Sequence, residues 1–366
     1  MEMIAIDRRS APVAKPAAPR VAASKIADDM AMLRTAAELS RDLHAPNPRI
    51  YWTDMLLSAG IGYAALAGAI LVGPLWLAIA CAVVAVLALY RAEGFIHEVS
   101  HIKHSALPGF RLGWNAAVGI PLMVPSFMYE GVHNLHHART RYGTQDDPEY
   151  LPLALMKPWT LPVFIAASLL APIALLFRYA VLAPLSLVVP GLRAIVVARY
   201  SGLQINPDFQ RRAPEGEAKA VWERLEIATS LWAITLLTLV ATGIVPLRAF
   251  LIFLAVASLV ALINQVRTLV AHLWENDGEP MSVTAQYLDS VNVPPPALLP
   301  VLWAPVGLRY HALHHLLPSV PYHALGEAHR RLVAALGSDS PYHRANHKGL
   351  LEPLARIWRS TQARGR

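Results

Sequence analysis

The sequence predicts an all-α integral membrane protein with two transmembrane helical hairpins (about four spans), interfacial helices, and a cytoplasmic helical cap that carries a histidine-rich metal site. Composition is the first observation behind this prediction: 55% of the 366 residues are hydrophobic and 16% are charged, whereas charged residues make up about a quarter of a soluble domain. The second is a pair of long apolar segments, each divided by a turn. The third is the gathering of histidines in the polar segments beside them.

The first predicted hairpin covers residues 55–90, which contain no Asp, Glu, Lys or Arg. A single helix of that length would be about 54 Å long at about 1.5 Å per residue, far more than the hydrocarbon core of about 30 Å. Gly73 and Pro74 near the middle predict a turn. The segment is therefore expected to form two spans whose ends return to the same side of the membrane.

The second predicted hairpin consists of residues 227–247 and 249–263, separated by Arg248. The bends of both hairpins are nearly free of charge, and the segments outside them hold most of the Lys and Arg. By the positive-inside rule, both termini and the histidine-rich segments are expected in the cytoplasm. The membrane is expected to be a bacterial inner membrane.

Two further apolar segments, residues 112–128 and 161–197, lie between the hairpins. Prolines and Arg178 interrupt them. These interruptions favour helices that lie in or re-enter the membrane interface, with additional spans as the alternative.

Three regions are predicted along the chain: a partly disordered cytoplasmic tail (1–50), a membrane domain (51–335) and a cytoplasmic C-terminal tail (336–366). The start of the chain lacks the apolar core and cleavage site of a secretory signal, and its Ala/Pro/Arg-rich composition is typical of disorder. The net charge of +7 suggests contact with anionic lipid headgroups and not with nucleic acid, because the basic residues are scattered beside apolar segments. The single Cys81 excludes an intramolecular disulfide and a cysteine-based metal site.

Ten of the 15 histidines form four groups. Two groups have the pattern H-x-x-H-H, called a histidine box below. Positions i, i+3 and i+4 share one side of a helix, so the three histidines of each box can bind two metal ions. A catalytic zinc takes about three protein ligands and a structural zinc about four. Eight or nine histidines therefore fit two metal ions better than one. The groups are His97, His101 and His104; His133, His136 and His137; His272; and His311, His314 and His315.

The first group also fits the H-E-x-x-H pattern of zinc proteases, in which Glu98 would act as general base. Asp277 could then serve as a distant third ligand. This alternative leaves six clustered histidines without a role. A metal store or transporter is a third possibility, disfavoured because the histidines gather on one side of the membrane and do not line a path across it.

Three boxes carry a resemblance to a known family: H-E-V-S-H at 97–101, H-N-L-H-H at 133–137 and H-A-L-H-H at 311–315. With their order relative to the two hairpins, they resemble the membrane fatty acid desaturase superfamily, integral-membrane di-iron enzymes. The resemblance covers roughly residues 50–335. It implies iron ligands at His97, His101, His133, His136, His137, His311, His314 and His315.

The same resemblance implies a ninth ligand at His272, which follows the second hairpin. Some relatives carry an asparagine one turn before this position, where this chain has Thr268, and the nearest asparagine is Asn264. His104 is not part of the usual first box. We expect it to support the ligands from a position behind them, with direct metal binding or a surface position as the alternatives.

Carboxylates near the boxes are expected to accept a hydrogen bond from the second ring nitrogen of a ligand histidine and so fix its orientation. The candidates are Glu98, Asp146, Asp147, Glu149, Glu275 and Asp277.

The resemblance implies an O2-dependent desaturase that removes hydrogen from neighbouring methylenes of a lipid-, CoA- or ACP-linked acyl chain. It would use two iron ions (Fe2+/Fe3+), O2 as co-substrate, and electrons from a ferredoxin or a cytochrome b5-like protein with its reductase. A hydroxylase or ketolase of an acyl, alkyl or carotenoid substrate is the alternative within the superfamily. No nucleic-acid partner is expected.

Overall fold

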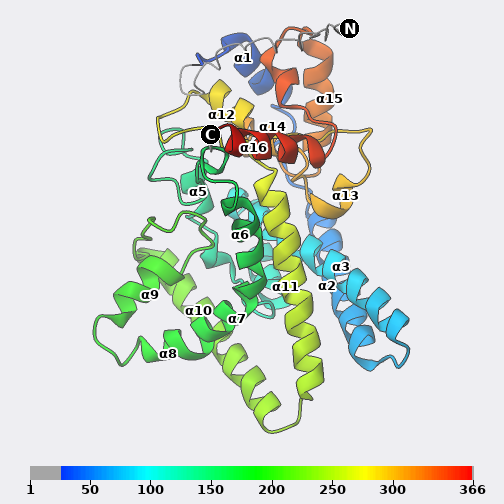
Figure 1. Cartoon of the computed structure of the whole chain (residues 1–366), viewed down its shortest axis with the longest axis vertical. Coiled ribbons are helices and arrows are strands. Elements are labelled where there is room, and N and C mark those ends of the chain that lie inside the picture. Colours follow the sequence, from blue (N-terminus) through cyan, green and yellow to red (C-terminus); the bar gives the residue numbers. More distant parts are fainter. Residues whose placement is uncertain (1–25, 365–366) are drawn as a thin grey trace, which may run out of the picture.

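The computed structural model describes residues 26–364, and this part of the chain is helical with only isolated β-bridges. The predicted all-α fold is confirmed. The disorder expected at the start of the N-terminal tail falls on residues 1–25, which lie outside the described residues. Figure 1 shows long helices extending downward from a cap of shorter helices, which contains the first and last described helices, α1 and α16.

The first hairpin consists of α2 (Pro48–Leu71) and α3 (Leu75–His101), joined at the predicted Gly73-Pro74 turn. Asn47 caps α2, because its side-chain oxygen accepts the backbone N–H groups of Arg49 and Ile50. The helices approach closely at Gly62, where an added Cβ would lie 2.7 Å from side-chain atoms of Leu89. This close packing holds α3 in place, and the last turn of α3 carries His97 and His101.

The second hairpin consists of α10 (Gly216–Ala241) and α11 (Leu247–Leu269). Its turn contains Gly243, which has a φ of 76°, a value that favours glycine. α11 packs against α3 and against the helical run that begins at Thr160. The two hairpins predicted from the sequence are therefore both present.

The first part of the segment at 161–197 fits the alternative of an additional span, because its prolines do not break the helix. α6 (Thr160–Ala167), η5 (Ser168–Leu170), α7 (Ala171–Phe177), η6 (Arg178–Leu182) and α8 (Ala183–Leu185) follow one another without interruption. Together they form a run of 26 residues that is long and apolar enough to cross a membrane. The residues described by the structure thus contain five candidate spans, one more than the predicted four.

The helical run from Thr160 to Leu185 can include two prolines and a buried arginine because of where each of them lies. Pro172 and Pro184 fall in the first turns of α7 and α8, where a missing N–H costs little, and 3-10 and π turns connect the pieces. The side chain of Arg178 is buried but has a counter-charge: it forms an ion pair with Glu226, and its Nη2 donates to Ser201 Oγ at 2.9 Å. Residues 112–128, in contrast, form only short helices: α4 (Phe110–Trp114), η2 (Asn115–Gly119) and η3 (Ser126–Met128).

The cap gathers short helices from both ends and the middle of the chain (Figure 1). The segment after residue 336 packs onto this cap: Ile357 is fully buried, and Arg356 forms an ion pair with Glu275 at 2.7 Å. Helices of the cap include α1 (Met30–Leu39), α12 (Val283–Asp289), α14 (His311–Leu316), α15 (Leu325–Ala335) and α16 (Leu351–Arg364). The remaining short helices are α5 (His133–His136), η4 (Leu153–Leu155), α13 (Pro300–Trp303), η7 (Pro341–Ala345) and α9 (Leu192–Tyr200), which lies below the cap beside α8 and α10 in Figure 1.

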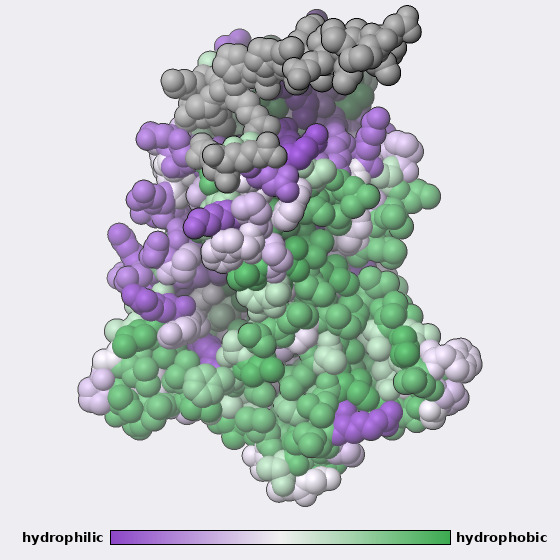
Figure 2. All heavy atoms as spheres, viewed as in Figure 1, coloured by the Kyte–Doolittle hydropathy of each residue, from purple (hydrophilic) through white to green (hydrophobic). Residues whose placement is uncertain are grey.

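The surface divides into an apolar lower part and a polar upper part (Figure 2). Large apolar side chains at the hairpin turns are widely exposed, including Leu71 at 80% and Leu75 at 74%. Exposure of this kind on consecutive long helices is typical of contact with lipid. The protein is therefore an integral membrane protein whose cap lies at one end of the helices.

Candidate metal centre

Nine histidines that are far apart in the sequence meet where the cap joins the long helices. They form two groups. Within each group, every histidine has one ring nitrogen that lies within 4.8 Å of a ring nitrogen of each other member. The five-histidine group contains His97, His101, His133, His137 and His314. The four-histidine group contains His136, His272, His311 and His315. All nine ligand positions implied by the resemblance belong to these groups, and their role as ligands remains a prediction.

The two H-x-x-H-H boxes each contribute to both groups, in opposite ways. In α5, His133 and His137 at positions i and i+4 join the five-histidine group, and His136 at i+3 joins the other. In α14 the pair at i and i+4 joins the four-histidine group, and His314 at i+3 joins the five-histidine group. This exchange follows from helix geometry, because i and i+4 point in similar directions and i+3 points to the side.

The ring nitrogens face one another at distances that suit a shared cation. His314 Nε2 lies 3.0 Å from His101 Nε2 and 3.2 Å from His137 Nε2. In the other group, His311 Nε2 lies 2.9 Å from His272 Nε2 and 3.2 Å from His315 Nε2. Metal–nitrogen bonds of about 2.1 Å would place neighbouring ligand nitrogens about 3.0–3.4 Å apart.

In three of the nine histidines, a hydrogen bond from Nδ1 indicates that Nε2 carries the lone pair. The Nδ1 atoms of His133, His136 and His272 each contact an oxygen at 2.8–3.0 Å. A neutral imidazole has one N–H and one lone pair, so Nδ1–H leaves the lone pair on Nε2. Facing lone pairs repel one another unless a cation lies between them. The donor set therefore fits two metal ions.

Burial keeps most of these imidazoles in the neutral form that binds metal. It lowers the pKa of His133, His137, His272, His311, His314 and His315 well below the usual value of 6.5. His136 differs: burial also disfavours its charged form, but the adjacent carboxylate of Asp147 raises its pKa. Neutral imidazole is a common ligand for zinc, copper, iron and nickel.

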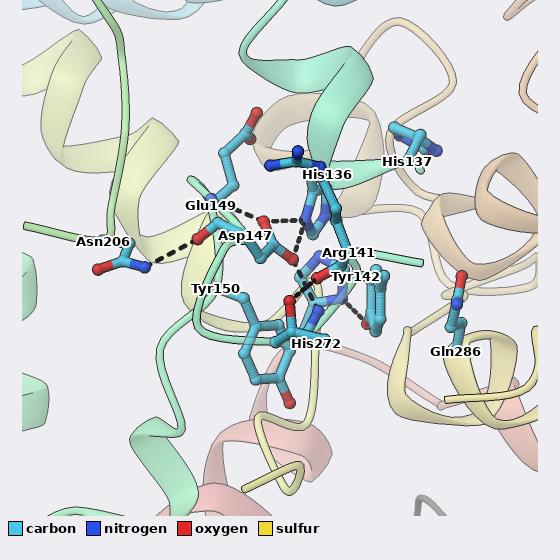
Figure 3. Close-up of polar contacts among 12 residues, drawn as sticks. His136, His137, Arg141, Tyr142, Asp147, Glu149, Tyr150, Asn206, His272 and Gln286 are labelled. Atoms are coloured by element: carbon cyan, nitrogen blue, oxygen red, sulfur yellow. Dashed lines mark hydrogen bonds and ion pairs between the residues drawn. The ribbon is translucent and has the colours of Figure 1, made fainter. Parts of the chain in front are cut away.

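Two of the carboxylates proposed from the sequence orient histidines of α5 (Figure 3). His136 Nδ1 lies 2.9 Å and 3.0 Å from the two oxygens of Asp147, whose side chain is fully buried. Asp147 also accepts the backbone N–H groups of Gly143 and Glu149. His133 Nδ1 lies 2.9 Å from Glu149 Oε1. Burial raises the pKa of Glu149 to about 7.

The residues that hold His272 were not identified from the sequence. His272 Nδ1 lies 2.8 Å from the hydroxyl of Tyr142 (Figure 3), which in turn donates to Asp289 Oδ2 at 2.9 Å. Tyr150 donates to the same carboxylate oxygen at 2.9 Å, and Ser290 Oγ lies 3.2 Å from His272 Nδ1. The one signal in the sequence was a lone carboxylate, Asp289, among apolar residues.

Glu98 is buried behind His97. Its Oε1 lies 3.5 Å from His97 Nδ1, and its Oε2 accepts the hydroxyl of Tyr51 and the backbone N–H of Tyr322. These contacts support a role in positioning α3 and His97. They do not suit the general base of a zinc protease, and Asp277, the third ligand in that scheme, is exposed and outside both groups.

Other predicted supporting residues lie elsewhere. His104 is half exposed and contacts Arg111 Nη1 at 2.8 Å, outside both histidine groups. Asp146 is exposed, and Glu275 pairs with Arg356 of α16. Thr268 and Asn264 are on α11 and line the cavity described next.

A cavity of about 450 Å³ lies against both histidine groups. It is formed mainly by α3, α11 and the helical run from α6 to α7, and it reaches His97 and His133 on one side and His272 and His311 on the other. Its size is within the range of about 300–1,000 Å³ typical of small-molecule sites. Its apolar wall includes Val163, Phe164, Ala167, Ala171, Leu175, Ala257 and Ala261.

Two histidine groups that could hold metal ions, at the junction of the cap and the membrane helices and beside a cavity with an apolar wall, fit a membrane oxidoreductase. The sequence pattern of the fatty acid desaturase family matches residues 74–346. The chain belongs to the membrane fatty acid desaturase-like superfamily and is a membrane di-iron oxidoreductase.

The chain is also 49% identical over 336 residues to "Ceramide hydroxylase" of Caulobacter vibrioides (strain NA1000 / CB15N). The match covers 92% of this chain and 95% of that protein. The desaturase activity expected from the sequence is thus supported only at the level of the superfamily. The hydroxylase alternative agrees better with this relative.

Proposed function

We propose that the protein hydroxylates a carbon of a ceramide-type lipid, using O2 and electrons from an external donor. The observation that carries the proposal is 49% identity, over almost the full length of both chains, to a protein named ceramide hydroxylase. The cavity beside the histidine groups supports it, because an apolar chain can lie there next to the metal centre. Desaturation of an acyl chain is the second candidate and rests on the family match alone.

We propose that the nine histidines hold two iron ions, five nitrogens facing one and four facing the other. When bound, the iron would supply the redox chemistry needed to transfer oxygen to an unactivated carbon. In the overall reaction, one atom of O2 enters the new C–OH group and the other leaves as water, while the donor supplies two electrons and solvent supplies two protons.

The protein's own residues would then act by orientation and by exclusion of water. Asp147, Glu149 and Tyr142 keep the lone pairs of three histidines directed at the centre. The apolar wall of the cavity holds the lipid chain beside these histidines and keeps water away. Fixing the reacting carbon in this way is a large part of what an enzyme contributes to such a reaction.

We propose that both termini and the cap face the cytoplasm of a bacterial inner membrane, where a ferredoxin or a cytochrome b5-like protein would deliver electrons. The distribution of Lys and Arg outside the hairpin turns supports this orientation. An external donor is required because the chain has a single cysteine, Cys81, and so cannot build its own iron–sulfur cluster.

The test is lipid profiling by mass spectrometry in a host that makes ceramide but lacks this protein. Expression of the wild type is expected to give ceramide with one additional oxygen atom, and His314→Ala should give none. A product that has instead lost two hydrogen atoms would support the desaturase candidate. Metal analysis of the purified chain separates both from a zinc protease, since about one zinc per chain without iron would exclude a di-iron centre.

A further inference from the structure

Two ionisable side chains face the cavity without an ion-pair partner among residues 26–364. Glu93 is on α3, one turn before His97, and lines the cavity. Within residues 26–364 no hydrogen bond or ion pair to its carboxylate is found. Arg267 is on α11, is 9% exposed, and lines the same cavity. Its Nε atom is buried without a hydrogen-bond partner; its side-chain contacts are Asn264 Oδ1, at a long 3.4 Å from Nη2, and the hydroxyl of Tyr90.

Two other arginines of the candidate spans that are buried or half-buried have carboxylate partners. Arg91 contacts Asp54 at 2.7 Å and 2.5 Å, and Arg178 pairs with Glu226. A charge in an apolar environment is costly unless it is satisfied, and ionisable groups at membrane depth mark functional sites. Glu93 has no polar partner and Arg267 has no carboxylate partner among the described residues. Because the two lie on helices that face one cavity, they indicate groups that meet a bound molecule.

We propose that Glu93 and Arg267 bind the amide linkage of the lipid substrate. A secondary amide offers one N–H donor, which a carboxylate accepts, and one carbonyl oxygen, which a guanidinium donates to. A ceramide has this linkage, whereas an ester or a plain hydrocarbon chain has no N–H. The inference rests on the proposed function and adds the residues that would recognise the substrate class.

The placement of the two residues also predicts where oxidation occurs. Glu93 precedes His97 by four residues, which is about 6 Å along the helix axis. If Glu93 and Arg267 hold the amide, the carbons that lie next to the metal centre are those within a few bonds of the amide. The alkyl chain beyond would lie along the small side chains of Ala167, Ala171, Ala257 and Ala261. Hydroxylation is expected near the amide and not in the middle of a chain.

The experiment measures binding separately from turnover, with the iron-loaded full chain in lipid nanodiscs. The Kd of a radiolabelled ceramide is compared for the wild type, Glu93→Leu, Glu93→Gln and Arg267→Met, and the position of the new hydroxyl is read by fragmentation mass spectrometry. Glu223→Leu and Arg224→Met are matched controls on α10, because both side chains are exposed. Iron content shows which variants keep the metal centre.

Glu93→Leu and Arg267→Met are expected to weaken binding about 10- to 100-fold, as for loss of a hydrogen bond to a charged group, and to spread the hydroxyl over several carbons. Glu93→Gln should recover most of the binding, since it keeps an acceptor oxygen, and the controls should match the wild type. An unchanged Kd and position in iron-containing Glu93→Leu and Arg267→Met would overturn the inference.

A second measurement covers the case in which these variants do not hold iron. N-methyl ceramide lacks the amide N–H, so the wild type should bind it at least about tenfold more weakly than ceramide. Equal binding of the two lipids would overturn the inference. Wild type that binds ceramide but adds no oxygen to it would reject the proposed function and leave the recognition of the amide standing.

Discussion

Replacement of Asp147 by asparagine tests how the protein orients the metal centre. The carboxylate of Asp147 is fully buried and accepts three donors: His136 Nδ1–H, the Gly143 N–H at 2.8 Å and the Glu149 N–H at 2.9 Å. Asparagine has the same shape but only one acceptor oxygen, and its NH2 group would face one of these N–H donors. His136 would lose its fixed orientation or a buried backbone N–H would lose its partner.

The size of the effect follows from these contacts. A hydrogen bond to a charged group contributes about 1.5–3 kcal/mol. Loss of a group that orients a metal-binding histidine typically weakens metal binding about 10- to 100-fold, which corresponds to about 1.4–2.7 kcal/mol. We therefore expect Asp147→Asn to weaken iron binding by that factor in the four-histidine group, which contains His136, and to affect the other iron less.

The assay is titration of the purified protein with a ferrous-iron chelator, with the iron that remains per chain measured by elemental analysis. Asp146→Asn is the control, because this neighbouring carboxylate is exposed and its change should leave binding within about 0.5 kcal/mol of the wild type. The reasoning is refuted if Asp147→Asn retains both irons as the wild type does, or if the two variants lose iron equally.

Four further changes have expected outcomes. Tyr142→Phe removes the hydroxyl between His272 and Asp289 and should lower iron affinity about tenfold in the same chelator titration, whereas an unchanged titration would show that the hydroxyl does not orient His272. His104→Ala should keep wild-type iron content and hydroxylation, since this half-exposed side chain lies outside both groups, and loss of iron would make it a ligand. Gly62→Ala places a methyl group against Leu89 and should destabilise the protein by roughly 1–3 kcal/mol in thermal inactivation, whereas Gly60→Ala, with open space around it, should not. Removal of iron by a chelator should lower the midpoint of thermal inactivation, because a metal that binds only the folded chain stabilises it; an unchanged midpoint would contradict a metal site that links α3, α5 and α14.

The hairpins and the histidine groups could be predicted because each leaves a local pattern. Residues 55–90 are too long and apolar for one span, and Gly73-Pro74 marks where they turn. The H-x-x-H-H spacing predicts that His133, His136 and His137 share one side of a helix and can serve two metal ions, and the structure divides them between the two groups. His272 lies 130 or more residues later in the chain, and its place beside these histidines could be predicted only by expecting all of them to bind one metal centre.

Features that depend on distant contacts could not be predicted in this way. Arg178 looked like an interruption of a helix, because its partner Glu226 is 48 residues away. Tyr142 and Asp289 support His272 from separate segments, and neither belongs to a motif. Glu275 is close to His272 in the sequence, yet its carboxylate forms an ion pair with Arg356 of α16, which lies in a segment predicted to be a C-terminal tail. The carboxylates that orient the site are those the fold brings near, which spacing alone does not determine.

The most direct test of the central claim is reaction of the purified, iron-loaded protein with ceramide, a chemical reductant and isotopically labelled O2. The account predicts that the ceramide product carries one labelled oxygen atom in a new hydroxyl group, and that His314→Ala forms no such product. A product without labelled oxygen that has lost two hydrogen atoms, or labelled product formed equally by His314→Ala, would contradict it.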